Sequence, residues 1–88
     1  MSAAAPPDPS HQPGAYLRHH RQRLGLDLQH IAAEIRVSPA ILSKIEHEER
    51  EGLPAPVFVR GFVLQYARAL GLPDAEKLAN AFLETMDG

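Results

Sequence analysis

The sequence predicts an all-α domain, a bundle of five helices. Apolar residues recur at helical spacing in five segments, and no segment shows the alternation with a period of two that marks a half-buried strand. Glycines, prolines and capping residues separate these segments at short intervals. The chain has 88 residues and no cysteine, so it can form one small core and has no disulfide or thiolate metal site to support it.

Residues 1–13 are predicted to be a disordered leader. They contain four prolines and no large aliphatic side chain after Met1, so they cannot bury enough surface to offset the entropy of ordering. The folded domain is therefore expected at residues 14–86. The chain shows no basic segment followed by an apolar block at its start, and a cytoplasmic location is the default expectation.

The five helices are expected over residues 14–24, 28–35, 38–48, 56–70 and 74–85. Small, polar or ring-constrained residues stand where each helix should begin or end, because they satisfy or avoid the free backbone groups there. These residues are Gly25, Asp27, Ser38, Pro39, Pro56, Gly71 and Asp74.

Residues 17–46 have the layout of a helix-turn-helix. Their LRxxRxxLGL opening and the SKIE of residues 43–46 resemble the lambda-repressor-like DNA-binding fold. The resemblance implies that Arg21 and Glu46 form a partly buried ion pair between the first and third helices. Both residues are therefore expected to belong to the scaffold, where the loss of one partner leaves a buried charge uncompensated.

The following segment, LPAPVFVRGFVLQYARALGL at residues 53–72, carries a second resemblance. Over residues 14–83 the chain is similar to the cytoplasmic helix-turn-helix domain of the RodZ family, bacterial cell-shape proteins. This implies an adaptor that binds MreB, the bacterial actin homologue, through exposed aromatic side chains at Phe58 and Phe62. RodZ proteins continue into a membrane helix, so association with a membrane is expected only if the native chain extends beyond Gly88.

The fourth predicted helix has two apolar stripes. One consists of Val59, Val63, Ala67 and Leu70, and the other of Phe58, Phe62 and Tyr66. The second stripe either is buried too, in a central helix covered on all sides, or is free to bind a partner. The resemblance favours a partner-binding surface made of Phe58, Arg60, Phe62 and Tyr66; self-association through the same stripe is a weaker alternative.

DNA binding is the main alternative function. The residues that would contact DNA are Arg18, Ser38, Ala40, Ser43 and Lys44. Pro39 and Ala40 stand at base-reading positions and offer no paired hydrogen-bonding groups. The net charge is −2, and residues 44–51 contain four glutamates against one lysine and one arginine. Any DNA binding is therefore expected to be weak and non-specific.

Catalysis and metal binding are not expected. The chain's histidines share no metal-ligand spacing, no serine has an evident base, and no glycine-rich phosphate loop is present. These histidines are His11, His19, His20, His30 and His47. We therefore expect a protein partner, with no cofactor, metal or small-molecule substrate.

Overall fold

A computed structural model describes residues 6–87, which form five α-helices and no strand. The helices are α1 (Pro13–Arg23), α2 (Leu28–Ile35), α3 (Pro39–His47), α4 (Pro56–Ala69) and α5 (Ala75–Asp87). The all-α prediction is confirmed, and each predicted helix limit lies within two residues of the observed one.

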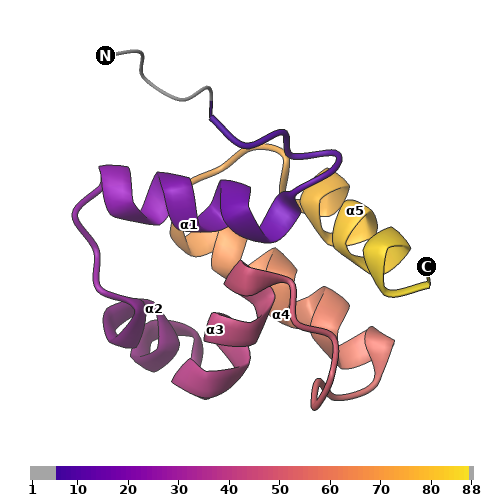
Figure 1. Cartoon of the computed structure of the whole chain (residues 1–88). Coiled ribbons are helices and arrows are strands. Elements are labelled where there is room, and N and C mark those ends of the chain that lie inside the picture. The colour runs from indigo at the N-terminus through magenta and orange to yellow at the C-terminus, as the bar shows by residue number, and fades with distance from the viewer. Residues whose placement is uncertain (1–5, 88) are drawn as a thin grey trace.

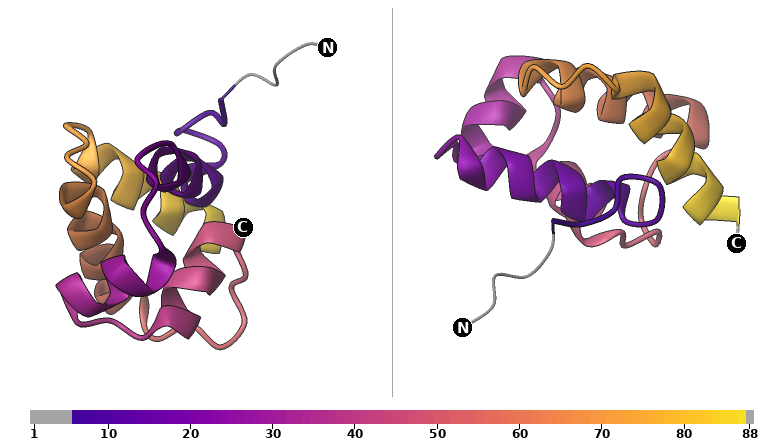
Figure 2. Two further views of the ribbon diagram at one scale, coloured as in Figure 1. Left: turned by 90° about the vertical axis from the view of Figure 1, so that its left-hand side faces the viewer. Right: turned by 90° about the horizontal axis from the view of Figure 1, so that it is seen from above.

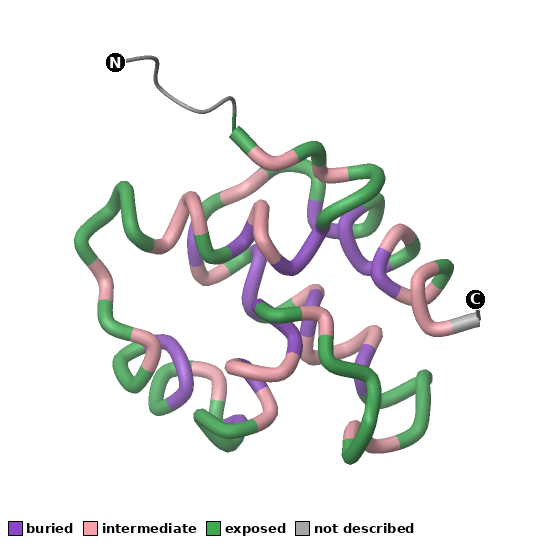
Figure 3. Tube along the Cα trace, viewed as in Figure 1, coloured by how far each residue is buried: buried purple, intermediate pink, exposed green. Residues whose placement is uncertain are grey.

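The helices surround a single core (Figures 1 and 2). The short helices α2 and α3 pack on each other on one side of the molecule, with α1 crossing above α3. The longest helix, α4, packs most extensively on α5 and also touches α2. The buried face of every helix points toward this centre (Figure 3). The arrangement leaves one long side of α4 facing water.

The core is made of aliphatic side chains with two aromatic ones, Tyr66 and Phe82. Both rings are fully buried, together with Leu17 from α1, Ile31 from α2 and Leu42 from α3. Burial of large apolar side chains is the main driving force for such a fold, at about 1.5–3 kcal/mol for each one. All five helices are therefore held by one shared set of contacts.

Several helix ends lie at the predicted capping residues. Gly25 ends α1 with a left-handed backbone (φ 70°), and the Ser38 hydroxyl accepts a hydrogen bond from the Ala40 N–H (3.2 Å). Asp27 precedes α2 as predicted, but its side chain makes no capping hydrogen bond. Its backbone carbonyl accepts from the N–H groups of His30 and Ile31, so the backbone alone starts this helix.

Residues 6–12, part of the predicted leader, form a turn before α1, and residues 1–5 lie outside the described part of the chain. The carboxylate of Asp8 accepts hydrogen bonds from the Ser10 N–H and the His11 ring, both 2.8 Å long. The Asp8 carbonyl also accepts from the N–H of Gln12 (2.7 Å), and Pro13 is buried as the first residue of α1. These local hydrogen bonds form a turn that leads into α1, and amino-acid composition alone does not indicate them.

Candidate functional site

The most exposed large apolar side chains of α4 lie in its first turn. Val57 is 71% exposed and Phe58 is 59% exposed, directly after the proline-containing loop that connects α3 to α4. The core uses the opposite face of the helix, where Val59 and Val63 are fully buried. We call Val57 and Phe58 the α4 patch. Val57 was not among the predicted site residues, although its position beside Phe58 in the first turn could have indicated that it is exposed.

Gly61 continues the exposed face of α4 from the α4 patch. It lies four residues after Val57 and three after Phe58, which places the three residues on one side of the helix. A Cβ atom built on Gly61 would meet no atom within 4 Å. Glycine inside a helix costs about 1 kcal/mol relative to alanine. Neither packing nor backbone geometry within the described residues therefore explains this glycine.

Two predicted partner-binding residues lie beside the α4 patch, each partly engaged in the fold. Phe62 is half-buried and packs against the core. Arg60 is half-buried, and its Nε donates a hydrogen bond to Oδ1 of Asn80 on α5 (3.4 Å). Phe62 is therefore less exposed than predicted, and Arg60 is attached to the neighbouring helix.

The assignment of Tyr66 to an exposed stripe is wrong, because its side chain is fully buried. An α-helix turns by about 100° at each residue, so residues eight apart differ in direction by about 80°. The predicted stripe therefore rotates gradually from water at Phe58, through the half-buried Phe62, into the core at Tyr66. An i, i+4, i+8 series is too long to remain on one face.

Tyr66 instead completes a polar network with the predicted ion pair. Arg21 Nε donates to Glu46 Oε2 (2.7 Å) and Arg21 Nη2 donates to Glu46 Oε1 (3.0 Å). The Tyr66 hydroxyl donates to the same carboxylate, and Arg21 Nη1 donates to the Leu26 carbonyl (2.8 Å). The predicted pairing is confirmed, and this network joins α1, α3 and α4.

The surroundings of Tyr66 and Arg21 keep these two groups in the protonation states that the network needs. Burial, followed by the hydrogen bond to Glu46, raises the pKa of Tyr66 well above its ordinary value. The hydrogen bonds that Arg21 donates to the Glu46 carboxylate raise the pKa of Arg21 as well. The phenol therefore stays a neutral donor and the guanidinium stays charged.

This pKa shift predicts a loss of stability at high pH. Above pH 10.0, the ordinary pKa of tyrosine, the unfolded chain releases the Tyr66 proton and the folded chain keeps it. Stability due to this group is complete below that pH and falls as pH rises, by up to about 1.4 kcal/mol per pH unit. Melting curves of the wild type and Tyr66→Phe between pH 9 and pH 11 will measure it. Equal pH dependence in the two proteins would contradict the prediction.

The α2–α3 region has the geometry of a helix-turn-helix. After α2, Arg36 turns the chain with a left-handed backbone (φ 59°), and Ser38 begins α3 two residues later. Ser38 and Ala40 are exposed at the start of α3, and Arg18 is exposed on α1. These three predicted DNA-contacting residues are therefore accessible.

The other two predicted DNA-contacting residues, Ser43 and Lys44, are less available. Both are half-buried. The Lys44 ammonium lies 3.7 Å from a carboxylate oxygen of Glu49, and the backbone carbonyl of Ser43 contacts the His47 ring (2.8 Å). The cationic group nearest the end of α3 is thus already beside an anionic one.

Comparison with known families agrees with this geometry. Residues 16–78, well over half of the chain, match the family described as Helix-turn-helix domain. The chain belongs to the helix-turn-helix domain family. In this helix-turn-helix domain the match begins in the first turn of α1, covers α2 to α4 and ends in the first turn of α5.

One relative of the helix-turn-helix domain is an uncharacterized protein of Haemophilus influenzae. The two are 40% identical over 75 residues, which make up 83% of this chain and 24% of that protein. The helix-turn-helix domain therefore spans about a quarter of the length of this relative. No solved structure matches the sequence of this helix-turn-helix domain.

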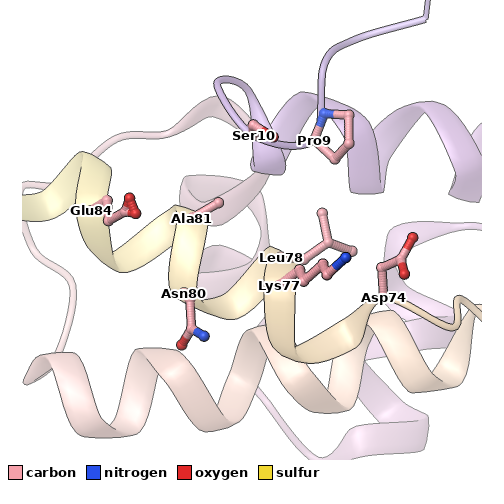
Figure 4. Close-up of a pocket in the computed structure, with 8 residues that line it drawn as sticks. All are labelled: Pro9, Ser10, Asp74, Lys77, Leu78, Asn80, Ala81 and Glu84. Atoms are coloured by element: carbon pink, nitrogen blue, oxygen red, sulfur yellow. The ribbon is translucent and has the colours of Figure 1, made fainter.

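A hollow of about 360 Å³ lies between the N-terminal segment and α5 of the helix-turn-helix domain (Figure 4). It is lined by Pro9, Ser10, Asp74, Lys77, Leu78, Asn80, Ala81 and Glu84. None of these residues belongs to the α4 patch. In the described part of the chain, no three histidine or acidic side chains are grouped to hold a metal ion. No helix in that part is long and apolar enough to cross a membrane.

Proposed function

We propose that this helix-turn-helix domain is a RodZ-type adaptor that docks onto an MreB-like filament protein in the cytoplasm through the α4 patch. The observation that carries the proposal is the exposure of Val57 and Phe58 in the first turn of α4. These residues lie within the LPxPVFVRGF motif that resembles the RodZ family. The proposed role is binding rather than catalysis.

The physical argument is that the fold does not need the Phe58 ring where it stands. An exposed aromatic side chain leaves a large apolar surface in water, and a partner that covers it gains that burial. Aromatic residues are enriched among the few side chains that dominate binding energy at protein interfaces. Arg60 and the exposed edge of Phe62 lie on either side and would contact the rim of the same partner.

The proposal predicts that Phe58→Ala greatly weakens docking while the fold stays intact. Loss of one central aromatic anchor costs about 2 kcal/mol of binding or more, which is roughly thirtyfold in affinity. The measurement is co-sedimentation with filaments of an MreB-like protein, together with a thermal melt of each variant.

Leu24 supplies a matched control for this experiment. Its side chain is 57% exposed, close to the value for Phe58, but it lies at the end of α1. Leu24→Ala should leave filament binding unchanged. If Phe58→Ala binds filaments as well as the wild type does, or if its melting transition collapses, the proposed role of the α4 patch is wrong.

DNA binding is the second candidate, and membership of the helix-turn-helix family together with the exposed start of α3 supports it. Ser38 and Ala40 are accessible there, but the end of α3 is acidic. We therefore expect only non-specific binding that weakens steeply as salt rises, because phosphate contacts, which release counterions, would supply nearly all of its affinity. The check is a selection from random duplexes. Recovery of a defined site bound at about nanomolar affinity in physiological salt would make DNA the main ligand.

A further inference from the structure

Two residues on adjoining parts of the surface destabilise the local backbone conformation relative to another residue type at the same position. Gly61 weakens a helix interior in which alanine would fit without contact. Arg36 adopts a left-handed backbone (φ 59°), a conformation that glycine takes at much lower cost. Residues that break a local rule without a structural gain are expected at functional sites.

The side chain of Arg36 gains no visible compensation. It is exposed, and it forms no hydrogen bond or ion pair with any side chain that the structure describes. Glu48, which also has a left-handed backbone, differs in this respect because its side chain is half-buried against Gly14 of α1. The arginine at position 36 is thus available to a partner.

Arg36 and Gly61 belong to one continuous surface. Arg36 lines a shallow hollow together with Gln65 and Arg68 of α4. Gly61, Gln65 and Arg68 follow one another at i, i+4 and i+7, so they share one face of α4, on which Gly61 is half-buried and Gln65 and Arg68 are exposed. The α4 patch begins this face, and Arg68 lies about 16 Å further along the helix.

The two ends of this face differ in chemistry. The first turn is apolar, and the far end carries the guanidinium groups of Arg68 and Arg36, neither of which is paired with a described carboxylate. Glu34 also lines the hollow, but its carboxylate lies 3.6 Å from the His30 ring. The hollow therefore carries two positive charges against one negative charge.

We infer that the docking surface extends from the α4 patch across Gly61 to Arg68 and Arg36, and that it receives an acidic surface of the filament partner. Gly61 is the point of closest approach, where the absence of a side chain lets the partner's backbone lie near α4. Arg68 and Arg36 then face carboxylates of the partner. This inference rests on the proposed function, because it uses the same partner and the same helix.

A protein surface fits this strip better than a DNA backbone does. A phosphate backbone could meet the two arginines, but it offers nothing to cover Val57, Phe58 and the bare backbone at Gly61. A protein with an apolar depression beside an acidic rim meets all three parts. Complementary charge at the rim of an interface sets register and association rate and is screened by salt.

Two of the test variants are expected to leave the fold intact. Alanine suits a helix interior better than glycine does, and glycine suits a left-handed backbone better than arginine does. The melting temperatures of Gly61→Ala and Arg36→Gly should therefore equal or exceed that of the wild type. Each variant should weaken co-sedimentation with the MreB-like filaments about tenfold. Arg68→Glu should weaken binding at least tenfold at low salt, and the difference should shrink to about twofold near 0.5 M salt, where exposed charges are screened.

Arg23→Glu is the matched control for the charge reversal. Arg23 and Arg68 are both exposed arginines in the last turn of a helix, so both reversals place a negative charge at a helix C-terminus. Arg23→Glu should leave filament binding unchanged. Equal loss for the two reversals would show a general charge effect and would overturn the inference.

The remaining outcomes separate this inference from the proposed function. If Phe58→Ala abolishes binding but the Gly61, Arg36 and Arg68 variants bind like the wild type, the extended surface is wrong and the α4 patch stands. If the wild type does not bind the filaments, both are wrong. If Arg36→Gly and Arg68→Glu reduce binding only to a short random-sequence DNA duplex, the arginines serve DNA and the inference fails.

Discussion

Glu46→Ala is expected to destabilise the domain by about 3–5 kcal/mol, because it removes the acceptor shared by two buried donors. The Glu46 side chain is 2% exposed and that of its partner Arg21 is 12% exposed. After the substitution, the Arg21 guanidinium and the Tyr66 hydroxyl lose their common carboxylate inside the protein. A domain of this size has a total stability of about 4–13 kcal/mol, so this loss approaches complete unfolding.

The measurement for Glu46 is a urea or thermal unfolding curve beside that of Glu49→Ala. Glu49 lies three residues further on, where its carboxylate is exposed and only 3.7 Å from the Lys44 ammonium. Exposed pairs of this kind contribute about 0–1 kcal/mol. Similar unfolding midpoints for the two variants would show that the buried network contributes little.

Gly14→Ala is expected to lower stability by about 3 kcal/mol or more, through a steric conflict between two helices. A Cβ atom at position 14 would lie 2.0 Å from the backbone carbonyl oxygen of Ile45. A carbonyl oxygen within α3 cannot rotate away, so α1 must separate from α3 and strain the core. At about 4–8 °C per kcal/mol for a domain of this size, the melting temperature should fall by at least about 12 °C.

Gly61→Ala provides the same chemical change at a helix position with no neighbour. Thermal melts of the two alanine variants should therefore move in opposite directions, with Gly61→Ala equal to or above the wild type. A melting temperature for Gly14→Ala within a few degrees of the wild type would mean that α1 and α3 can separate cheaply. That result would contradict the tight packing of their backbones.

The helices could be predicted from the sequence because their signals are local. Residues such as Gly25, Ser38 and Pro39 act within one turn of their own position, so helix limits follow without knowledge of the tertiary structure. The Arg21–Glu46 pair was found through a motif resemblance, which carries long-range information. Periodicity alone would not have joined residues 25 positions apart.

The candidate site was only partly predictable because exposure depends on how α4 is rotated in the bundle. Phe58 and Tyr66 have the same character in the sequence, but one faces water and the other binds Glu46 in the core. The buried carboxylate of Glu46 on α3 requires a hydrogen-bond donor, and this requirement decides which of the two residues is buried. The sequence of α4 alone does not indicate it. Similarly, the importance of Gly14 depends on a carbonyl oxygen of another helix.

The hydrogen bond from Tyr66 to Glu46 also fixes the phase of α4 about its own axis. The core packs against one side of this helix, and the proposed partner contacts the other side. Core packing and partner binding therefore both depend on the number of residues between Phe58 and Tyr66. One residue inserted between Phe58 and Val59 would leave the core sequence from Val59 onward in place and turn the first turn by about 100°. The folded domain would then present Phe58 in another direction. The spacing between Phe58 and Tyr66 therefore determines both how α4 packs in the core and in which direction the proposed docking surface faces.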